Sequence, residues 1–445
     1  MCWKYISALL IISGAISCFG QETAPIVNIQ GLGSIRGSVG HTAWTSRPIS
    51  EFQGIPYGQA PVGTLRFKPT VKATAWSGIR DASQPGIRCP QIDDDYLNVE
   101  NEDCLTLSVY SNSLDADRPV MVYIHGGWFF KGGADEYKPD YLLESDIVLV
   151  VIQYRLGPLG FLSTLTDDIP GNVGMLDVIT ALEWVPKNYL ENANKNIAVM
   201  GGTTSQDGLF LLNELHEIQP NLLRTLNTTH ALLDYVHLLH EKFGHSKFDG
   251  SLEGYALGLN FYDIAALRWE DMVSSLTDIC GNHGIKAPVL SEVQAFSNAN
   301  PGNVYLYSFD YSSALTQKNL TVPFPHERPV HHAEELKYLF PKEDLDEEDV
   351  RMAKIMVQLW TSFAIRGAPA AKGVVYWPPL DGLFGPFLKI NTESEQTNYY
   401  LNELTATVYK YRVFGGAGSR MAVSVGSIVT LVIVALGVKS LRLAD

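Results

Sequence analysis

Three short segments hold the residues of this 445-residue chain whose types and spacing could do chemistry. The stretch Gly201–Ser205 (GGTTS) places hydroxyl groups after two glycines, the stretch His125–Gly127 ends in two glycines, and His331–His332 supplies imidazoles. A hydroxyl attacks a carbonyl carbon when a neighbouring base takes its proton, and histidine is the most frequent base. Backbone N–H groups can then stabilise the oxyanion that forms. The chemistry to test is therefore nucleophilic attack on a carbonyl group.

Each of these segments is next to an element that could hold it in place. Val120–Ile124 and Ile147–Ile152 are short apolar, β-rich runs, and Ile197–Met200 is a third that leads into Gly201. Between Leu176 and Val185 the apolar residues have helical spacing. This order of strand, helix, strand and turn predicts an α/β fold with a mostly parallel sheet covered by helices.

Two further elements are expected nearer the C-terminus. Val304–Phe309 has the pattern of a strand, and Val350–Ile365 has that of an amphipathic helix stopped by Gly367 and Pro369. No internal repeat or low-complexity linker interrupts the chain before Gly415. We therefore expect one domain across residues 21–414.

The composition excludes several classes of protein. Hydrophobic residues make up 46% and charged residues 18%, which excludes a disordered, collagen-like or coiled-coil chain. The 33 basic and 48 acidic residues give a net charge of −15, which repels phosphate backbones. We expect a globular protein with no nucleic-acid partner, no cofactor and no metal.

Both ends of the chain are apolar. Residues 1–20 have a basic residue, Lys4, before an apolar run and small residues after it, as in a secretory signal peptide. Met421–Val438 has no charge over 18 residues, about 27 Å as a helix, which is close to the hydrocarbon thickness of a bilayer. We expect an extracellular domain, a short Gly-rich stalk (415–420), one transmembrane helix (421–438) and a short cytoplasmic tail (439–445) at the plasma membrane. A secreted or lipid-anchored protein is the alternative.

Exported chains carry disulfides and glycans. With Cys2 and Cys18 removed in the signal peptide, Cys89 and Cys104 are expected to form a disulfide, which leaves Cys280 as a buried thiol. Asn227 and Asn319 begin acceptor sequences for N-glycosylation.

Several motifs in order give the chain a broad resemblance to a known family. They are FQGIPY (52–57), PVGTLRF (61–67), EDCL (102–105) and QYRLGPLGF (153–161). From Gly31 to about Phe414 the chain resembles the type-B carboxylesterases and cholinesterase-like proteins of the α/β-hydrolase fold. The resemblance supports the pairing of Cys89 with Cys104 and implies a structural ion pair between Arg66 and Glu102.

The resemblance assigns the nucleophile of ester hydrolysis to a tight Gly-x-Ser-x-Gly turn. Here Thr203 stands at the serine position and Ser205 at the second glycine position. A β-branched residue is poorly tolerated in strained backbone, and its methyl group would crowd the carbonyl that it attacks. Ser205 does not fit by a two-residue slip, because Thr203 and Asp207 would then occupy glycine positions.

The other parts of the site are altered to different degrees. The motif HHAEEL (331–336) places the base at His332, whereas no acid is recognisable between Thr203 and His332, where Glu253 is too weak a match to accept. This interval is shorter than is usual in the family, which predicts a shortened cap region. The oxyanion positions are Gly126, Gly127, Trp128 and Thr204, and Trp128 replaces a third glycine.

These changes predict a catalytically inactive or impaired esterase-like ectodomain on a membrane anchor. It resembles the non-enzymatic adhesion proteins of this family, such as neuroligins, neurotactin and gliotactin, and the resemblance implies a protein partner at the cell surface. Two alternatives are a carboxylic ester hydrolase that uses Thr203 and His332, and a protein that binds apolar ligands or esters.

Overall fold

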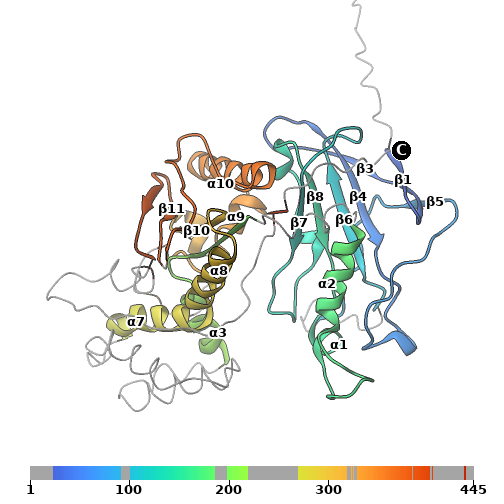
Figure 1. The fold of residues 1–445 in the computed structure, drawn as a ribbon, viewed down its shortest axis with the longest axis horizontal. Helices are drawn as coiled ribbons and strands as arrows, with labels where there is room; N and C mark the ends of the chain where they lie inside the picture. Colours follow the sequence, from blue (N-terminus) through green and yellow to red (C-terminus); the bar gives the residue numbers. More distant parts are fainter. Residues whose placement is uncertain are drawn as a thin grey trace, which may run out of the picture.

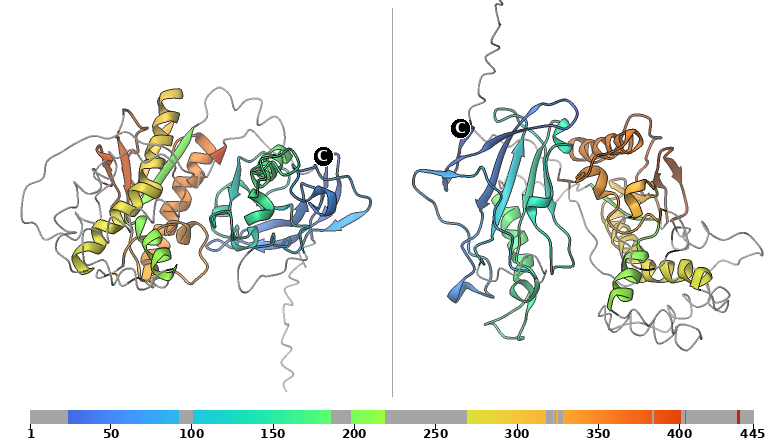
Figure 2. Two further views of the ribbon diagram at one scale, coloured as in Figure 1. Left: turned by 90° about the horizontal axis from the view of Figure 1, so that it is seen from below. Right: turned by 180° about the vertical axis from the view of Figure 1, so that it is seen from behind.

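The structure is a computed structural model that describes residues 24–91, 101–185, 198–218, 269–317, 322, 324, 328–382, 384–400, 403 and 435–436. Its elements form two groups that lie side by side (Figure 1). The first group holds β1 to β8 with α1 and α2, and the second holds β9 to β12 with α3 and α7 to α10. Two further views in Figure 2 show the same arrangement.

A six-stranded sheet forms the centre of the first group. Its order is β13-β7-β8-β6-β4-β3, and β7 and β8 are its one parallel pair among the described strands. The strands are β3 (Ser38–His41), β4 (Pro48–Pro56), β6 (Thr106–Ser111), β7 (Val120–Ile124), β8 (Val148–Ile152) and β13 (Ala435–Leu436). A small sheet of β1 (Ile26–Ile29), β2 (Gly33–Arg36) and β5 (Ile79–Asp81) lies beside it.

Two helices follow β8 and pack near the end of this strand. They are α1 (Gly157–Phe161) and α2 (Val173–Trp184), and Val178 and Ala181 of α2 are buried among the strand residues. Arg155, directly after β8, is fixed to α2 because its guanidinium donates to both carboxylate oxygens of Asp177 at 2.7 Å. Both side chains are almost fully buried, so this pair holds the segment after β8 against α2.

A four-stranded sheet of order β12-β11-β10-β9 forms the centre of the second group. Here β9 and β10 pair in parallel, as do β10 and β11, whereas β12 is antiparallel. The strands are β9 (Val199–Thr204), β10 (Val304–Phe309), β11 (Phe387–Ile390) and β12 (Glu395–Thr397). The helices are α3 (Gly208–Ile218), α7 (Trp269–Gly281), α8 (Ala287–Ala299), α9 (Leu336–Leu339) and α10 (Glu347–Arg366), with a π-helical turn at Asn282–Lys286.

Helix α10 joins the two groups. Its N-terminus is capped by Asp346, which accepts from two backbone N–H groups, and its C-terminus ends at Gly367 in the left-handed conformation. Trp360 and Met356 lie in a core that contains Met121 and Tyr123 of one sheet and Tyr305 and Tyr307 of the other. One hydrophobic core, on the α10 side, therefore contacts both sheets.

The α/β content agrees with the predicted fold class, and the strands at 120–124, 148–152 and 304–309 and the helix at 347–366 confirm the predicted elements. The prediction of a single, mostly parallel sheet was wrong, because the described strands form three sheets and each of them contains both parallel and antiparallel pairs. The six-stranded sheet is largely antiparallel because β4 pairs antiparallel with both β3 and β6, and β6 pairs antiparallel with β8.

The predictions for the two ends of the chain remain predictions. Residues 1–20, 415–434 and 437–445 lie outside the described residues. Ala435–Leu436 pairs with β7 as a two-residue strand. In the part of the chain that the structure describes, none of the helices has the length and apolar character needed to cross a bilayer.

Candidate functional site

Thr203 lies inside strand β9 and not on a turn. The sequence predicts that the strand ends at Met200, but β9 continues to Thr204 and stays in register with β10, with Thr203 opposite Ser308. β-Branched residues favour this extended backbone. Gly202 is required because an added Cβ would be 2.3 Å from the ring of Tyr307, across the pair. The tight, strained turn that presents a nucleophile is therefore absent at Thr203.

The Thr203 hydroxyl already has a partner. Its Oγ1 is 2.6 Å from the phenol oxygen of Tyr400, and both side chains are buried. Tyr400 belongs to the core between α8 and the four-stranded sheet. The nucleophile position is thus hydrogen-bonded into the core behind the strand.

The turn after β9 is formed by residues 205–207, later than predicted. Gln206 anchors it, since its backbone N–H donates to the Val330 carbonyl and its side-chain oxygen accepts from the Val330 N–H. Lys286 is buried behind this turn and donates from Nζ to the Ser205 carbonyl at 2.7 Å. These contacts tie the turn to the segment that precedes His332.

Asp207, at the end of this turn, contacts two of the predicted site residues. Its Oδ2 accepts the backbone N–H of Thr204 at 2.8 Å, and its Oδ1 is 2.9 Å from Nδ1 of His332. The carboxylate is buried, with 1% of the residue exposed. Because the Thr204 N–H is already donated to Asp207, it does not point at an open oxyanion position.

The electrostatic environment of His332 is acidic. Burial lowers the pKa of His332, but the hydrogen bond and charge of Asp207, with the charge of Glu335, outweigh burial and raise the pKa above 6.5. Burial also raises the pKa of Glu335 from 4.5 to about 7, and the charge of Asp207 acts in the same direction. His331 is held apart from this pair by Glu334, whose Oε1 is 2.8 Å from Nε2 of His331.

The predicted oxyanion loop forms a tight turn after β7. Gly127 has a φ of +116°, and an added Cβ would lie 1.8 Å from the Lys131 carbonyl oxygen, so only glycine fits. Trp128 has a φ of +58°, and the Gly127 carbonyl accepts from Lys131. Among the described residues, the N–H groups of Gly126 and Gly127 donate to no partner. Two donors of the predicted set are therefore available.

Aromatic rings connect this loop to the histidine. Trp128 packs against Phe210 of α3 at 5.5 Å between ring centroids, and Phe210 stacks on His332 at 5.2 Å. Trp128 is 44% exposed. The structure thus brings Trp128, Thr204 and His332 to one region, and joins them through Phe210 and Asp207.

Sequence reasoning missed Asp207 and Phe210. An acidic residue at the start of a helix is visible in the sequence, but nothing there indicates that its carboxylate turns back to Thr204 and across to His332. Glu253, weighed as the acid, lies outside the described residues, as do the glycosylation candidates Asn227 and Asn319.

Two predictions that concern stability are confirmed. Cys89 and Cys104 form a disulfide, and Cys280 is a buried free thiol. Arg66 donates from Nε and Nη2 to the Glu102 carboxylate, at 2.5 to 2.9 Å. The disulfide and the ion pair tie the residues directly before β6 to Cys89 and to the loop after β4.

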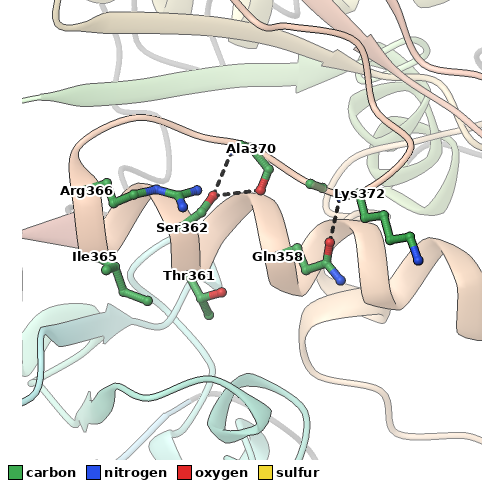
Figure 3. A pocket seen from close by; sticks show the side chains of 8 residues that line it. Gln358, Thr361, Ser362, Ile365, Arg366, Ala370 and Lys372 are labelled. Atoms are coloured by element: carbon green, nitrogen blue, oxygen red, sulfur yellow. Dashed lines mark hydrogen bonds between the residues drawn. The ribbon is translucent and has the colours of Figure 1, made fainter.

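A pocket of about 360 Å³ lies away from this site, on α10. Figure 3 shows that Ser362 is hydrogen-bonded to Ala370 and Gln358 to Lys372, so these polar groups hold the following loop. None of the predicted site residues lines this pocket.

Comparison with known proteins gives partial relatives. Glutactin of Drosophila melanogaster is 38% identical over 205 residues, which are 43% of this chain and 20% of glutactin. Cocaine esterase of Oryctolagus cuniculus is 39% identical over 206 residues, 43% of this chain and 37% of that enzyme. Juvenile hormone esterase of Tribolium castaneum is 36% identical over 212 residues, 46% of this chain and 35% of that protein. The matched part of the chain thus spans between a fifth and somewhat over a third of these curated relatives.

The family match is broader than these pairwise matches. It covers residues 23–191 and 186–407, which include strands β1 to β12 and all of the predicted site residues. The disulfide, the Arg66–Glu102 pair and the α/β architecture agree with it. The chain belongs to the carboxylesterase family.

Proposed function

We propose that this protein is a carboxylesterase-family ectodomain that has lost ester hydrolysis through Thr203 and recognises a protein partner at the cell surface. The observation that carries the proposal is the environment of Thr203. Its side chain is 4% exposed, lies in a regular strand, and is hydrogen-bonded to the buried phenol of Tyr400. A nucleophile must instead be presented on a strained turn, within reach of its base.

The occupied oxyanion donor supports the same proposal. In this fold the N–H of the residue after the nucleophile stabilises the oxyanion. Here that N–H, on Thr204, donates to Asp207. A buried carboxylate at this position would also repel the negative charge that develops during acyl transfer.

Exposed aromatic rings beside the site could contact a protein. Trp128 is 44% and Phe130 55% exposed, and both belong to the loop after β7. Aromatic side chains are enriched at the centres of protein interfaces. The proposed signal peptide and membrane span would place this loop outside the cell.

Ester hydrolysis remains the second candidate, because the base and part of the oxyanion loop are preserved. His332 is fixed by Asp207, and the Gly126 and Gly127 N–H groups are not donated to any described residue. Thr203 would have to leave Tyr400 and the strand to act. Binding of an apolar ligand by the same loop is a third candidate.

The test uses the full chain expressed in cultured cells. We expect cells that express it to aggregate with each other or with partner cells, while the purified chain fails to hydrolyse p-nitrophenyl acetate. The Thr203→Ser variant should also be inactive, because a serine at this position still lies within strand β9 and the Thr204 N–H is still donated to Asp207. Hydrolysis by the unaltered chain that His332→Ala abolishes would overturn the loss of activity, and absence of aggregation with every tested cell type would overturn recognition.

A further inference from the structure

The Asp207 carboxylate is placed in a way that fixes the protonation of His332. Its Oδ2 accepts the Thr204 N–H at 2.8 Å, and its Oδ1 is 2.9 Å from Nδ1 of His332. An ionised carboxylate only accepts hydrogen bonds. The hydrogen between Asp207 and His332 is therefore on Nδ1, and Nε2 of the neutral ring carries a lone pair.

The other faces of the imidazole are defined as well. Phe210 stacks on the ring from α3, and the charge of Glu335 acts on it from the segment before α9. Within the described part of the chain, Nε2 has no hydrogen-bond partner, and 39% of the side chain is exposed. The basic nitrogen of the ring is therefore free for a molecule from solvent.

We propose that Asp207 is the positioning carboxylate of His332, and that the two form a His–Asp dyad without a protein nucleophile. His332 Nε2 then accepts a hydrogen bond from a water molecule or from the hydroxyl of a bound ligand, and not from Thr203. When the ring takes up a proton from solvent, the new N–H bond forms on Nε2 and the imidazolium is paired with the Asp207 carboxylate. The acid thus comes from the turn that follows β9 and not from the interval between Gly208 and His331.

The position of Asp207 explains both halves of the altered site. One carboxylate oxygen keeps the base oriented, as the acid of a catalytic triad does. The other oxygen occupies the Thr204 N–H. The same side chain therefore orients the base and occupies one oxyanion donor, in agreement with the proposed loss of hydrolysis through Thr203. The dyad rests on that proposed function only in having no protein nucleophile.

The experiment is a titration of the full chain labelled with ¹⁵N-histidine, with His332→Ala to assign the His332 signals. In the unaltered chain we expect the neutral ring to carry its hydrogen on Nδ1 and to titrate above 6.5. In Asp207→Asn the amide oxygen can still accept the Thr204 N–H, so the fold is kept. The pKa of His332 should nevertheless shift downward and the Nδ1–H tautomer should lose its dominance.

Glu335→Gln is the matched control. It removes a nearby negative charge but no hydrogen bond to the ring, so the pKa should shift less and the tautomer should stay the same. An unchanged pKa and tautomer in Asp207→Asn, or an equal response in Glu335→Gln, would overturn the dyad. Cell aggregation by Asp207→Asn is measured in parallel. The two proposals can therefore fail separately. A titration that contradicts the dyad does not affect the proposed recognition of a partner, and a failure of the unaltered chain to aggregate cells does not affect the titration.

Discussion

At the scale of single residues, the hydrogen bond between Thr203 and Tyr400 should contribute to the free energy of unfolding, which can be measured. Both oxygens are buried and bonded to each other at 2.6 Å. Thr203→Val removes one partner at nearly constant volume and leaves a buried phenol unsatisfied, so we expect a loss of about 1–3 kcal/mol in the free energy of unfolding. Tyr400→Phe should cost a similar amount. In urea denaturation the double variant should lose less than the sum, whereas additive losses would contradict a direct bond.

The acidic groups around His332 predict a pH dependence of stability. The pKa of Glu335 is raised to about 7, so the folded chain keeps a proton that the unfolded chain releases above about 4.5. Stability from this group therefore falls as pH rises from about 4.5 to 7. The raised pKa of His332 acts in the same direction, because its contribution is present below 6.5 and is lost as pH rises through the folded pKa.

Glu335→Gln should accordingly flatten the profile. We expect the difference in urea midpoint between pH 5 and pH 8 to be smaller in this variant than in the unaltered chain. Glu343→Gln, an exposed change on the loop before α10, is the control and should keep the slope. A slope that Glu335→Gln leaves unchanged would place the titrating group elsewhere.

The sequence could predict the candidate site only in part. The positions of Thr203, His332 and Trp128 in the site could be predicted, because the family motif assigns a role to each of them. The contact between Asp207 and His332 joins residues 125 positions apart, and the bond between Thr203 and Tyr400 joins residues 197 positions apart. No local pattern encodes such pairings, because they depend on how the strands and the loops between them are placed.

At the scale of elements, β9 shows why a strand boundary is difficult to predict. The glycines at 201 and 202 indicated a turn, but Gly202 is a packing position under Tyr307 and the chain stays extended to Thr204. Helix α10 was predictable because its apolar spacing and its stop at Gly367 are local signals. The end of β9 was therefore predicted wrongly because it depends on a neighbouring strand, whereas α10 was predicted correctly from local sequence.

The N-cap of α10 gives a prediction at this scale. Asp346 accepts from the N–H groups of Glu348 and Asp349 at 2.9 and 2.8 Å. Asp346→Ala should lower the free energy of unfolding by about 1 kcal/mol, measured by urea denaturation, because two N–H groups lose their acceptor. Asp344→Ala, an exposed aspartate two positions earlier that does not cap the helix, should change it little. Equal effects would indicate a general charge effect and not a cap.

At the scale of the whole molecule, the two sheets share one core although no strand pairing connects them among the described residues. Trp360 of α10 packs on Tyr307 of the four-stranded sheet at 5.3 Å and lies in the same cluster as Met121 and Tyr123 of the six-stranded sheet. Thr361 adds a hydrogen bond to Ser145, on the loop before β8, at 3.0 Å. The helix therefore couples the two groups energetically.

This coupling predicts that both groups unfold together. In urea, tryptophan fluorescence and far-UV circular dichroism should report one coincident transition. Trp360→Ala should shift both probes to lower urea by the same amount, for a loss of about 3–5 kcal/mol, because the cavity lies where both sheets meet. Tyr376→Ala, at a side chain that is 81% exposed, is the control and should shift neither. Two separate transitions, of which Trp360→Ala moves one, would show that each sheet is stable by itself and that α10 belongs to the second group alone.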